Sequence, residues 1–316
     1  MSAISRKQKT KAEAFLIEAR NTVGKKTWFA NSTEEKYENA AELYEKAANA
    51  FKVGGYHHEA GDAYRKAADL YQNKLKNLGE ASKALASAGS CYKKSSPSDA
   101  VDAYRAAVSI LCDAGRLTQA AKLSKQCGEL FENEGVAEGE EAHGSNVKMA
   151  IESYEQAAEL FNMEDSKGQA ASCMTKVAEL CSAALDPPEL LRAAKIYDEL
   201  GRRCLESNML KFNAKMYFLQ AIFCHLGNGD AIAGTKALQR YENLDYSFGE
   251  SREGRFCRQL VEAAEAYDDE AIATASFEYD RITKLDPWKT SMLLKLKRSV
   301  EDQGGLGEDD DDVDLT

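Results

Sequence analysis

A pattern of small and apolar residues recurs nine times along this chain, about once every twenty residues, and it constrains the fold more than any other feature. Most copies have a small residue, an apolar or aromatic residue four positions later, a small or apolar pair at seven and eight, and an apolar or aromatic residue at eleven. The stretch AAELYEKAANAF shows it as Ala40, Tyr44, Ala47-Ala48 and Phe51. These spacings place all five residues on one face of an α-helix.

The copies begin at residues 40, 60, 81, 100, 120, 150, 170, 193 and 213. A unit of this length is one helix and one turn, so two copies make an antiparallel helix pair. Small residues let neighbouring helices approach closely, and large ones fill the gaps between them. We therefore predict an all-α fold, a right-handed α-solenoid of TPR-like antiparallel helix pairs. A single large helical bundle is the alternative, and the nearly constant spacing favours the solenoid.

Turn-forming residues support this division of the chain. Glycine ends a helix in the left-handed conformation and proline starts the next one at its first position. Such residues fall between the predicted units at Gly54-Gly55, Gly79, Ser95-Ser96-Pro97, Gly115, Asp186-Pro187-Pro188 and Asn208. One interval is thirty residues, and its extra length is polar and acidic, so we predict a long loop at 133–145.

The strict repeat ends near residue 228, which suggests three regions. Residues 1–228 form the predicted solenoid, with a first helix at 6–22, a loop at 23–33 and a capping box of Ser32 and Glu35. Residues 229–300 form a predicted C-terminal helical bundle cap, with helices at 230–243, 252–267, 269–284 and 287–300. Residues 301–316 are expected to be a flexible acidic tail.

The net charge is concentrated in that tail. The chain carries a formal charge of −11, and residues 301–316 contain eight acidic residues with no Lys or Arg. The remaining chain is therefore nearly neutral. A general nucleic-acid partner is excluded by the lack of a basic footprint.

Nothing in the sequence indicates an enzyme. The eight cysteines show neither a CxxC motif nor a metal spacing, so we expect reduced, buried thiols in a soluble cytoplasmic protein with no signal peptide or membrane span. His57 and His58 are adjacent and would point apart on a helix, and His225 is expected to be a satisfied core histidine. Gly24-Lys25-Lys26-Thr27 lacks the upstream glycine of a phosphate loop. We predict no cofactor, no metal and no catalytic residue.

Specific strings resemble the soluble NSF attachment protein (SNAP) family. They are AAELYEKAANAFK at 40–52, AGRLTQAAK at 114–122, LKFNAKMYFLQAIFCHL at 210–226 and LDPWKTSMLLKLK at 285–297. The loop at 133–145 and the Asp-rich tail look most like the gamma type. The resemblance covers essentially the whole chain. It implies an adaptor, peripheral on Golgi and vesicle membranes, that binds SNARE complexes containing syntaxin-type proteins and recruits and stimulates the NSF ATPase. The alternative is a general TPR-like scaffold unrelated to NSF.

The resemblance implies a membrane-contact site in the loop at 23–33. Family members carry exposed aromatic residues there. Trp28 and Phe29 occupy this loop next to Lys25 and Lys26, and aromatic residues flanked by lysines suit the headgroup boundary of an anionic membrane. The alternative is that Trp28 and Phe29 pack the first helix against the second. The loop has few apolar residues, so we expect weak membrane binding.

Two further sites follow from the same resemblance. Family members meet the acidic SNARE bundle with scattered cations, and the matching positions are Lys93, Lys94, Arg116, Lys122 and Lys215. The family also ends in acidic residues with a penultimate leucine that stimulates NSF, which matches Asp309, Asp310, Asp311, Asp312, Asp314 and Leu315. The alternatives are ordinary solvated helix surface for the cations and a solvating tail for the acidic end.

Overall fold

The structure is a computed structural model that describes residues 3–26, 30–134 and 142–304. The chain divides into two compact units, Met1–Cys173 and Met174–Thr316. The described residues contain α-helices, one short π-helical segment and no β-strand. The predicted all-α solenoid is confirmed, and the sense of its superhelical turn stays a prediction.

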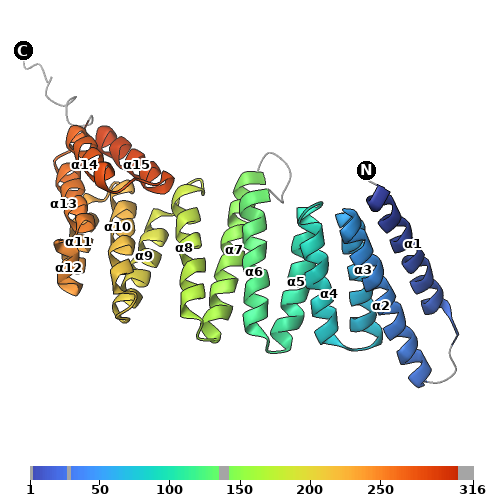
Figure 1. Cartoon of the computed structure of the whole chain (residues 1–316). Helices are drawn as coiled ribbons and strands as arrows, with labels where there is room; N and C mark the ends of the chain where they lie inside the picture. Colours follow the sequence, from blue (N-terminus) through green and yellow to red (C-terminus); the bar gives the residue numbers. More distant parts are fainter. Residues whose placement is uncertain (1–2, 27–29, 135–141, 305–316) are drawn as a thin grey trace, which may run out of the picture. The chain divides into compact units, whose positions relative to one another are not determined.

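The first unit is built from helices that run alternately up and down in Figure 1. Each helix from α1 to α7 packs against the next one along the chain. The helices are α1 (Ala3–Gly24), α2 (Ala30–Gly54), α3 (His57–Asp69), which continues as the π-helical η1 (Leu70–Lys74), α4 (Leu78–Tyr92), α5 (Pro97–Asp113), α6 (Leu117–Glu134) and α7 (Ala142–Met163). The boundary between the two units falls within α8 (Lys167–Ala183).

Alternate helices of the first unit form two layers. His58 of α3 lies beside Asp99 of α5, and a guanidinium nitrogen of Arg105 in α5 lies 3.9 Å from the sulfur of Met149 in α7. In the other layer, Glu45 of α2 is within electrostatic range of Glu80 in α4. The helices α3, α5 and α7 therefore share one layer, and α2 and α4 share the other.

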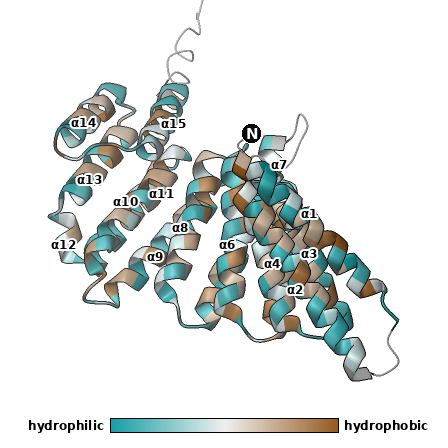
Figure 2. Ribbon diagram, turned by 45° about the vertical axis from the view of Figure 1, so that its right-hand side comes forward, coloured by the Kyte–Doolittle hydropathy of each residue, from teal (hydrophilic) through white to brown (hydrophobic). Residues whose placement is uncertain are grey.

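The repeat residues form the core between these layers. In α7 the five positions of the pattern are at most 1% exposed, and they are Ala150, Tyr154, Ala157, Ala158 and Phe161. Figure 2 shows hydrophilic and hydrophobic bands along the helices, as expected when one side of each helix is buried. Several turns also lie where the sequence predicts them. Gly55 and Gly115 have φ of 83° and 67°, and Pro97 begins α5.

The second unit surrounds one central helix. Its helices are α9 (Leu190–Leu205), α10 (Lys211–Gly227), α11 (Ala231–Leu244), α12 (Tyr246–Gly249), α13 (Arg252–Glu265), α14 (Asp269–Ile282) and α15 (Pro287–Gly304). Helix α10 contacts α9, α11, α13 and α15, which explains why its apolar residues are not confined to one face. Phe218 of α10 stacks on Tyr241 at 4.1 Å, and Phe223 stacks on Trp288 at 6.2 Å.

Several predicted boundaries are wrong. The loop predicted at 23–33 is shorter, because α1 extends to Gly24 and α2 has begun by Ala30, so Ser32 is not an N-cap. The loop predicted at 133–145 is shorter as well, since α6 extends to Glu134 and α7 begins at Ala142. Gly79 lies inside α4 rather than between helices. The domain boundary at 228/229 falls between α10 and α11 and stays a prediction.

Candidate partner-binding surfaces

Lys93 and Lys94 are exposed in the turn between α4 and α5. The turn is closed by backbone bonds, including one of 2.7 Å from the Ser96 N–H to the Tyr92 carbonyl. The Tyr92 hydroxyl donates to Asp62 of α3 at 2.6 Å. The lysine pair is therefore presented on a rigid support.

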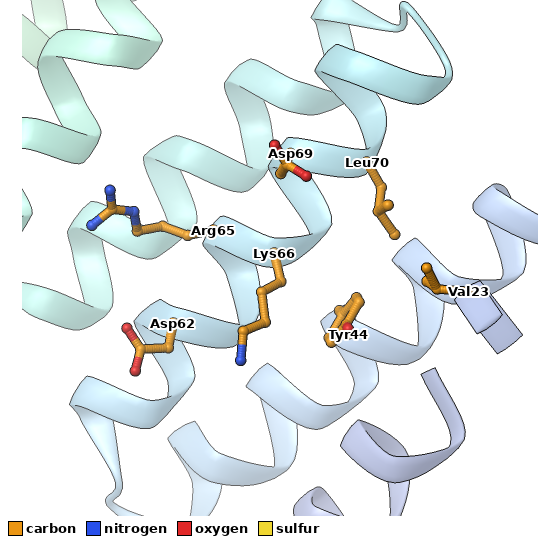
Figure 3. A pocket seen from close by; sticks show the side chains of 7 residues that line it. All are labelled: Val23, Tyr44, Asp62, Arg65, Lys66, Asp69 and Leu70. Atoms are coloured by element: carbon orange, nitrogen blue, oxygen red, sulfur yellow. The ribbon is translucent and has the colours of Figure 1, made fainter. Parts of the chain in front are cut away.

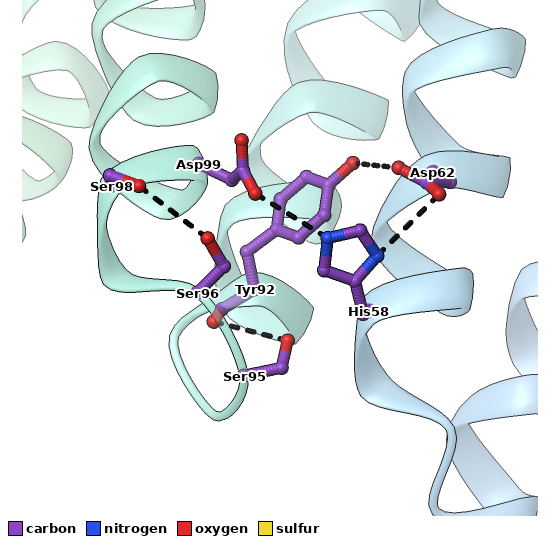
Figure 4. Close-up of polar contacts among 7 residues, drawn as sticks. All are labelled: His58, Asp62, Tyr92, Ser95, Ser96, Ser98 and Asp99. Carbon is purple, nitrogen blue, oxygen red and sulfur yellow. Dashed lines mark hydrogen bonds and ion pairs between the residues drawn. The ribbon is translucent and has the colours of Figure 1, made fainter.

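His58 adds a second link between this turn and α3 (Figure 4). Its Nδ1 lies 3.6 Å from a carboxylate oxygen of Asp62, and its Nε2 lies 3.5 Å from one of Asp99 at the start of α5. The imidazole also packs edge-on against the Tyr92 ring, with centroids 5.4 Å apart. His58 thus joins α3 to α4 and α5.

Arg116 and Lys122 lie toward the opposite end of the helices. Arg116 is exposed in the α5–α6 turn, and its guanidinium lies 3.9 Å from the position that a Cβ would take on Gly79 of α4. Lys122 is exposed on α6. Helix α5, whose 17 residues span about 25 Å, separates the two turns. The structure therefore does not bring Lys93 and Lys94 together with Arg116.

A cluster of carboxylates that joins α2 and α4 was missed by the sequence analysis. Burial, followed by the charges of Glu80 and Glu42, raises the pKa of the Glu45 carboxyl. Burial and these carboxylates, together with Glu38, raise the pKa of Tyr71 to about 12. Glu42 and Glu80 are themselves paired with Lys46 and Lys83, at 3.4 and 2.6 Å, so this layer carries charges of both signs.

The loop predicted to contact membranes has more lysines near it than the sequence suggested. Lys25 and Lys26 are exposed, and the Lys36 ammonium donates to the Lys25 carbonyl at 3.0 Å. The ammonium groups of Lys36 and Lys74 lie 4.5 and 6.0 Å from the ring centroid of Tyr37. Lys74 is far away in sequence, so only the fold reveals it. Trp28 and Phe29 lie outside the described residues.

In the second unit, an apolar tip precedes Lys215. Met209, Leu210 and Phe212 are 89%, 45% and 70% exposed at the α9–α10 turn. Lys211 lies one helical turn before the half-buried Lys215, so both face the same side of α10. We refer to Met209–Phe212 as the apolar tip. Three apolar residues within a predicted turn were the signal that could have revealed it.

The acidic tail, including Asp309, Asp310, Asp311, Asp312, Asp314 and Leu315, lies outside the described residues. The helix that precedes it, α15, is anchored at its first turn. The Trp288 indole N–H of α15 donates to the Ser182 hydroxyl of α8 at 2.8 Å, and Lys289 forms an ion pair with Asp286 while only 5% exposed.

One open groove of about 550 Å³ crosses α1, α2 and α3 (Figure 3). Val23, Tyr44 and Leu70 supply its apolar part. Its charged residues are of both signs, and they are Asp62, Arg65, Lys66 and Asp69. This mixture favours neither an anionic nor a cationic ligand.

The titratable groups of the described residues do not form a reactive centre. Burial raises the pKa of seven cysteine thiols, which disfavours the nucleophilic thiolate, and these are Cys91, Cys112, Cys127, Cys173, Cys204, Cys224 and Cys257. Across residues 3–26, 30–134 and 142–304, no group of three His, Cys, Asp or Glu could hold a metal ion. Nor is any described helix long and apolar enough to cross a membrane.

His225 corrects one expectation. Its Nδ1 is buried and has no hydrogen-bond partner among the described residues, so the prediction of a satisfied core histidine is wrong. Burial lowers the pKa of His225, and the nearby Asp230 carboxylate opposes this shift.

Comparison with known proteins extends these observations. A family model described as "Soluble NSF attachment protein, SNAP" matches residues 10–301. The chain is 36% identical over 231 residues to the alpha-soluble NSF attachment protein of Vitis vinifera, which covers 73% of this chain and 75% of that protein. It is 34% identical over 240 residues to the beta-soluble NSF attachment protein of Bos taurus, a match that covers 76% of this chain and 75% of that protein. It is also 32% identical over 239 residues to the vesicular-fusion protein SEC17 of Komagataella phaffii, a match that covers 76% of this chain and 77% of that protein.

The family model spans most of the two described units, and the relatives match this chain over about three quarters of its length. The apolar spacing, the helical pairs and the aromatic core of the second unit all fall within the matched residues. This chain belongs to the soluble NSF attachment protein (SNAP) family.

Proposed function

We propose that this chain is a non-enzymatic adaptor that binds SNARE complexes and recruits the NSF ATPase, which it stimulates to disassemble them in vesicle fusion and intracellular transport. One observation carries the proposal: the SNAP family model matches residues 10–301. The bound SNAREs would be of the syntaxin type. The protein would act in the cytoplasm and on Golgi and vesicle membranes, and the gamma type stays a prediction.

Cations on rigid turns would contact the acidic SNARE bundle. Lys93 and Lys94 occupy the α4–α5 turn, Arg116 and Lys122 lie toward the other end of α5, and Lys215 follows the apolar tip. Exposed cations steer an acidic partner and speed its encounter. Each contact contributes only about 0.2–1 kcal/mol, so binding requires several of them together.

The lysines near Tyr37 would support weak, peripheral membrane contact by Trp28 and Phe29. Lys25, Lys26, Lys36 and Lys74 can attract anionic headgroups, while the aromatic side chains enter the headgroup boundary. Flotation with vesicles that contain anionic lipid would test this. Replacement of Trp28 and Phe29 by serine should reduce binding, and unchanged flotation would refute the contact.

The decisive experiment is NSF-driven disassembly of a SNARE complex with this protein as the sole adaptor. Disassembly that requires ATP, NSF and this chain would support the proposal. Leu315→Ala should lower the stimulation of NSF without altering SNARE binding, and undiminished stimulation would remove the tail from the proposal.

The alternative function, a general helical scaffold, predicts a different result. A pull-down with NSF in the presence and absence of assembled SNAREs separates the two. Capture of NSF that depends on SNAREs supports the adaptor, and no capture under either condition supports the scaffold.

A further inference from the structure

A groove along the exposed face of α15 lies outside the surfaces described above. Its volume is about 530 Å³. Leu285, Pro287 and Leu294 form its apolar part, and Leu294 is 54% exposed. Lys295 and Arg298 line the same groove, so apolar and cationic groups are adjacent along one side of the helix.

The two cations of the groove differ from their neighbour Lys297 in forming no ion pair among the described residues. The neighbouring Lys297 lies 3.1 Å from an oxygen of Asp269 and 3.8 Å from one of Glu301. Lys295 and Arg298 form no ion pair within residues 142–304, and the residues lining the groove include no carboxylate. The groove therefore suits a short acidic segment that carries an apolar side chain.

Such a segment follows directly in this chain. Helix α15 ends at Gly304, and the twelve remaining residues include Asp309–Asp312, Asp314 and Leu315. Lys295 lies about 14 Å back along the helix axis from Gly304. Eight extended residues span about 26 Å, so a tail that reverses direction can bring its aspartates beside Arg298 and Lys295. Leu315, three residues beyond, then reaches the level of Leu294.

We propose that the acidic tail of this chain docks in the α15 groove, with Asp309–Asp312 beside Arg298 and Lys295 and with Leu315 against Leu294. Because the pairs are exposed, the contact is reversible and weakens as salt is added. Since the tail is already tethered, docking needs no second molecule and gains from a high effective concentration.

The docked state would withhold the residues that NSF needs. This consequence rests on the proposed function, whereas the docking itself does not. Reversal of Lys295 and Arg298 should therefore raise NSF stimulation at low salt if both proposals hold.

Photo-crosslinking in the full chain tests the docking without NSF. Leu315 is replaced by the isosteric diazirine photo-leucine, and the crosslinked peptides are identified by mass spectrometry. At low salt we expect intramolecular crosslinks to residues 285–298 in most of the crosslinked product, with at least a threefold loss at about 0.5 M salt.

Charge variants show whether the cations of the groove are responsible for these crosslinks. Lys295→Glu with Arg298→Glu should reduce the crosslinks to 285–298 at least fivefold, whereas Lys236→Glu on α11 should preserve them. Lys236 is exposed and has no ion pair among the described residues, so its reversal is a control for each of the single variants Lys295→Glu and Arg298→Glu, which should each weaken the crosslinks. Crosslinks scattered over the surface, crosslinks that persist after the double reversal, or crosslinks only between two copies would each overturn the proposal.

Discussion

Four glycines allow aromatic rings to pack directly against a helix backbone. A Cβ added at Gly61, Gly89, Gly128 or Gly201 would lie 2.4–3.0 Å from the ring of Tyr92, Tyr104, Tyr154 or Phe218, respectively. Real Cβ atoms do not approach as closely as at Gly61, Gly89 and Gly201, and the contact at Gly128 would be unusually tight, so the ring or the helix would have to move. Glycine is normally unfavourable within a helix, and here close packing compensates for its entropic cost.

Gly201→Ala tests this feature where the ring has least freedom. Phe218 is fully buried and stacked on Tyr241, and the added Cβ would lie 2.4 Å from its ring. Overpacking costs about 1–3 kcal/mol, and better helix propensity returns about 1 kcal/mol. We expect a net loss of up to about 2 kcal/mol in the free energy of unfolding, measured by urea denaturation. Gly168→Ala is the control, because nothing lies within 4 Å of its Cβ position, and it should be neutral or stabilising.

His225 should make stability depend on pH. Burial lowers the pKa of His225 in the folded state from the ordinary value of 6.5. Well above pH 6.5, His225 is neutral in both the folded and the unfolded chain. As the pH falls below it, the unfolded chain binds a proton that the folded chain resists, so the free energy of unfolding decreases. Urea denaturation at pH 7.5 and 5.5 should show a smaller difference for His225→Gln than for the parent, and equal differences would contradict the assignment.

At the scale of helices, the apolar spacing predicted nine of them, and its one error of register is instructive. The last copy was assigned to start at Asn213, with Tyr217 four residues later. The structure buries Ala214 and Phe218 fully, while Asn213 is exposed and Tyr217 half-buried. Both registers fit the sequence because apolar and aromatic residues are consecutive in α10. Helices packed on several sides lack the one-sided pattern from which a register is deduced.

Helix α15 is joined to the rest of the second unit through Trp288. The hydrogen bond from its indole N–H to the buried Ser182 hydroxyl links residues 106 positions apart. Trp288→Phe removes this bond, and a cavity is expected as well. We predict a loss of about 1–2 kcal/mol in the free energy of unfolding. Ser182→Ala removes the same bond, so the double variant should lose about 1 kcal/mol less than the sum of the single variants. Additive losses in the urea-denaturation cycle would show that the bond contributes nothing.

At the scale of the molecule, composition and spacing predicted the helices but not the distribution of charge. The carboxylate cluster around Glu45 and the lysines near Tyr37 each combine residues from different helices. Such neighbours depend on how the layers align, which local periodicity does not specify. The positions of Lys93, Lys94, Arg116 and Lys122 came from family resemblance, and their role in binding SNAREs stays a prediction.

Charge reversal at the two ends of α5 tests that role. Lys94→Glu removes an exposed cation from the α4–α5 turn, and Lys122→Glu removes one from α6, toward the other end of α5. Each should weaken binding to an assembled SNARE complex by up to about fivefold, and the double variant should also reduce the salt dependence of binding. Binding should be measured at two salt concentrations, with Lys236→Glu as a control of equal charge change. If affinity and salt dependence both stay unchanged, this surface is not the binding site.

The alternating direction of the helices has a consequence for what can be bound. It places Lys93 and Lys94 at one end of α5 and Arg116 at the other, about 25 Å apart along a helix of 17 residues. A compact acidic ligand can therefore touch only one end at a time. If both ends engage one partner, as proposed for the SNARE bundle, that partner must carry negative charge over at least that length, which an elongated acidic rod does and a compact ligand does not.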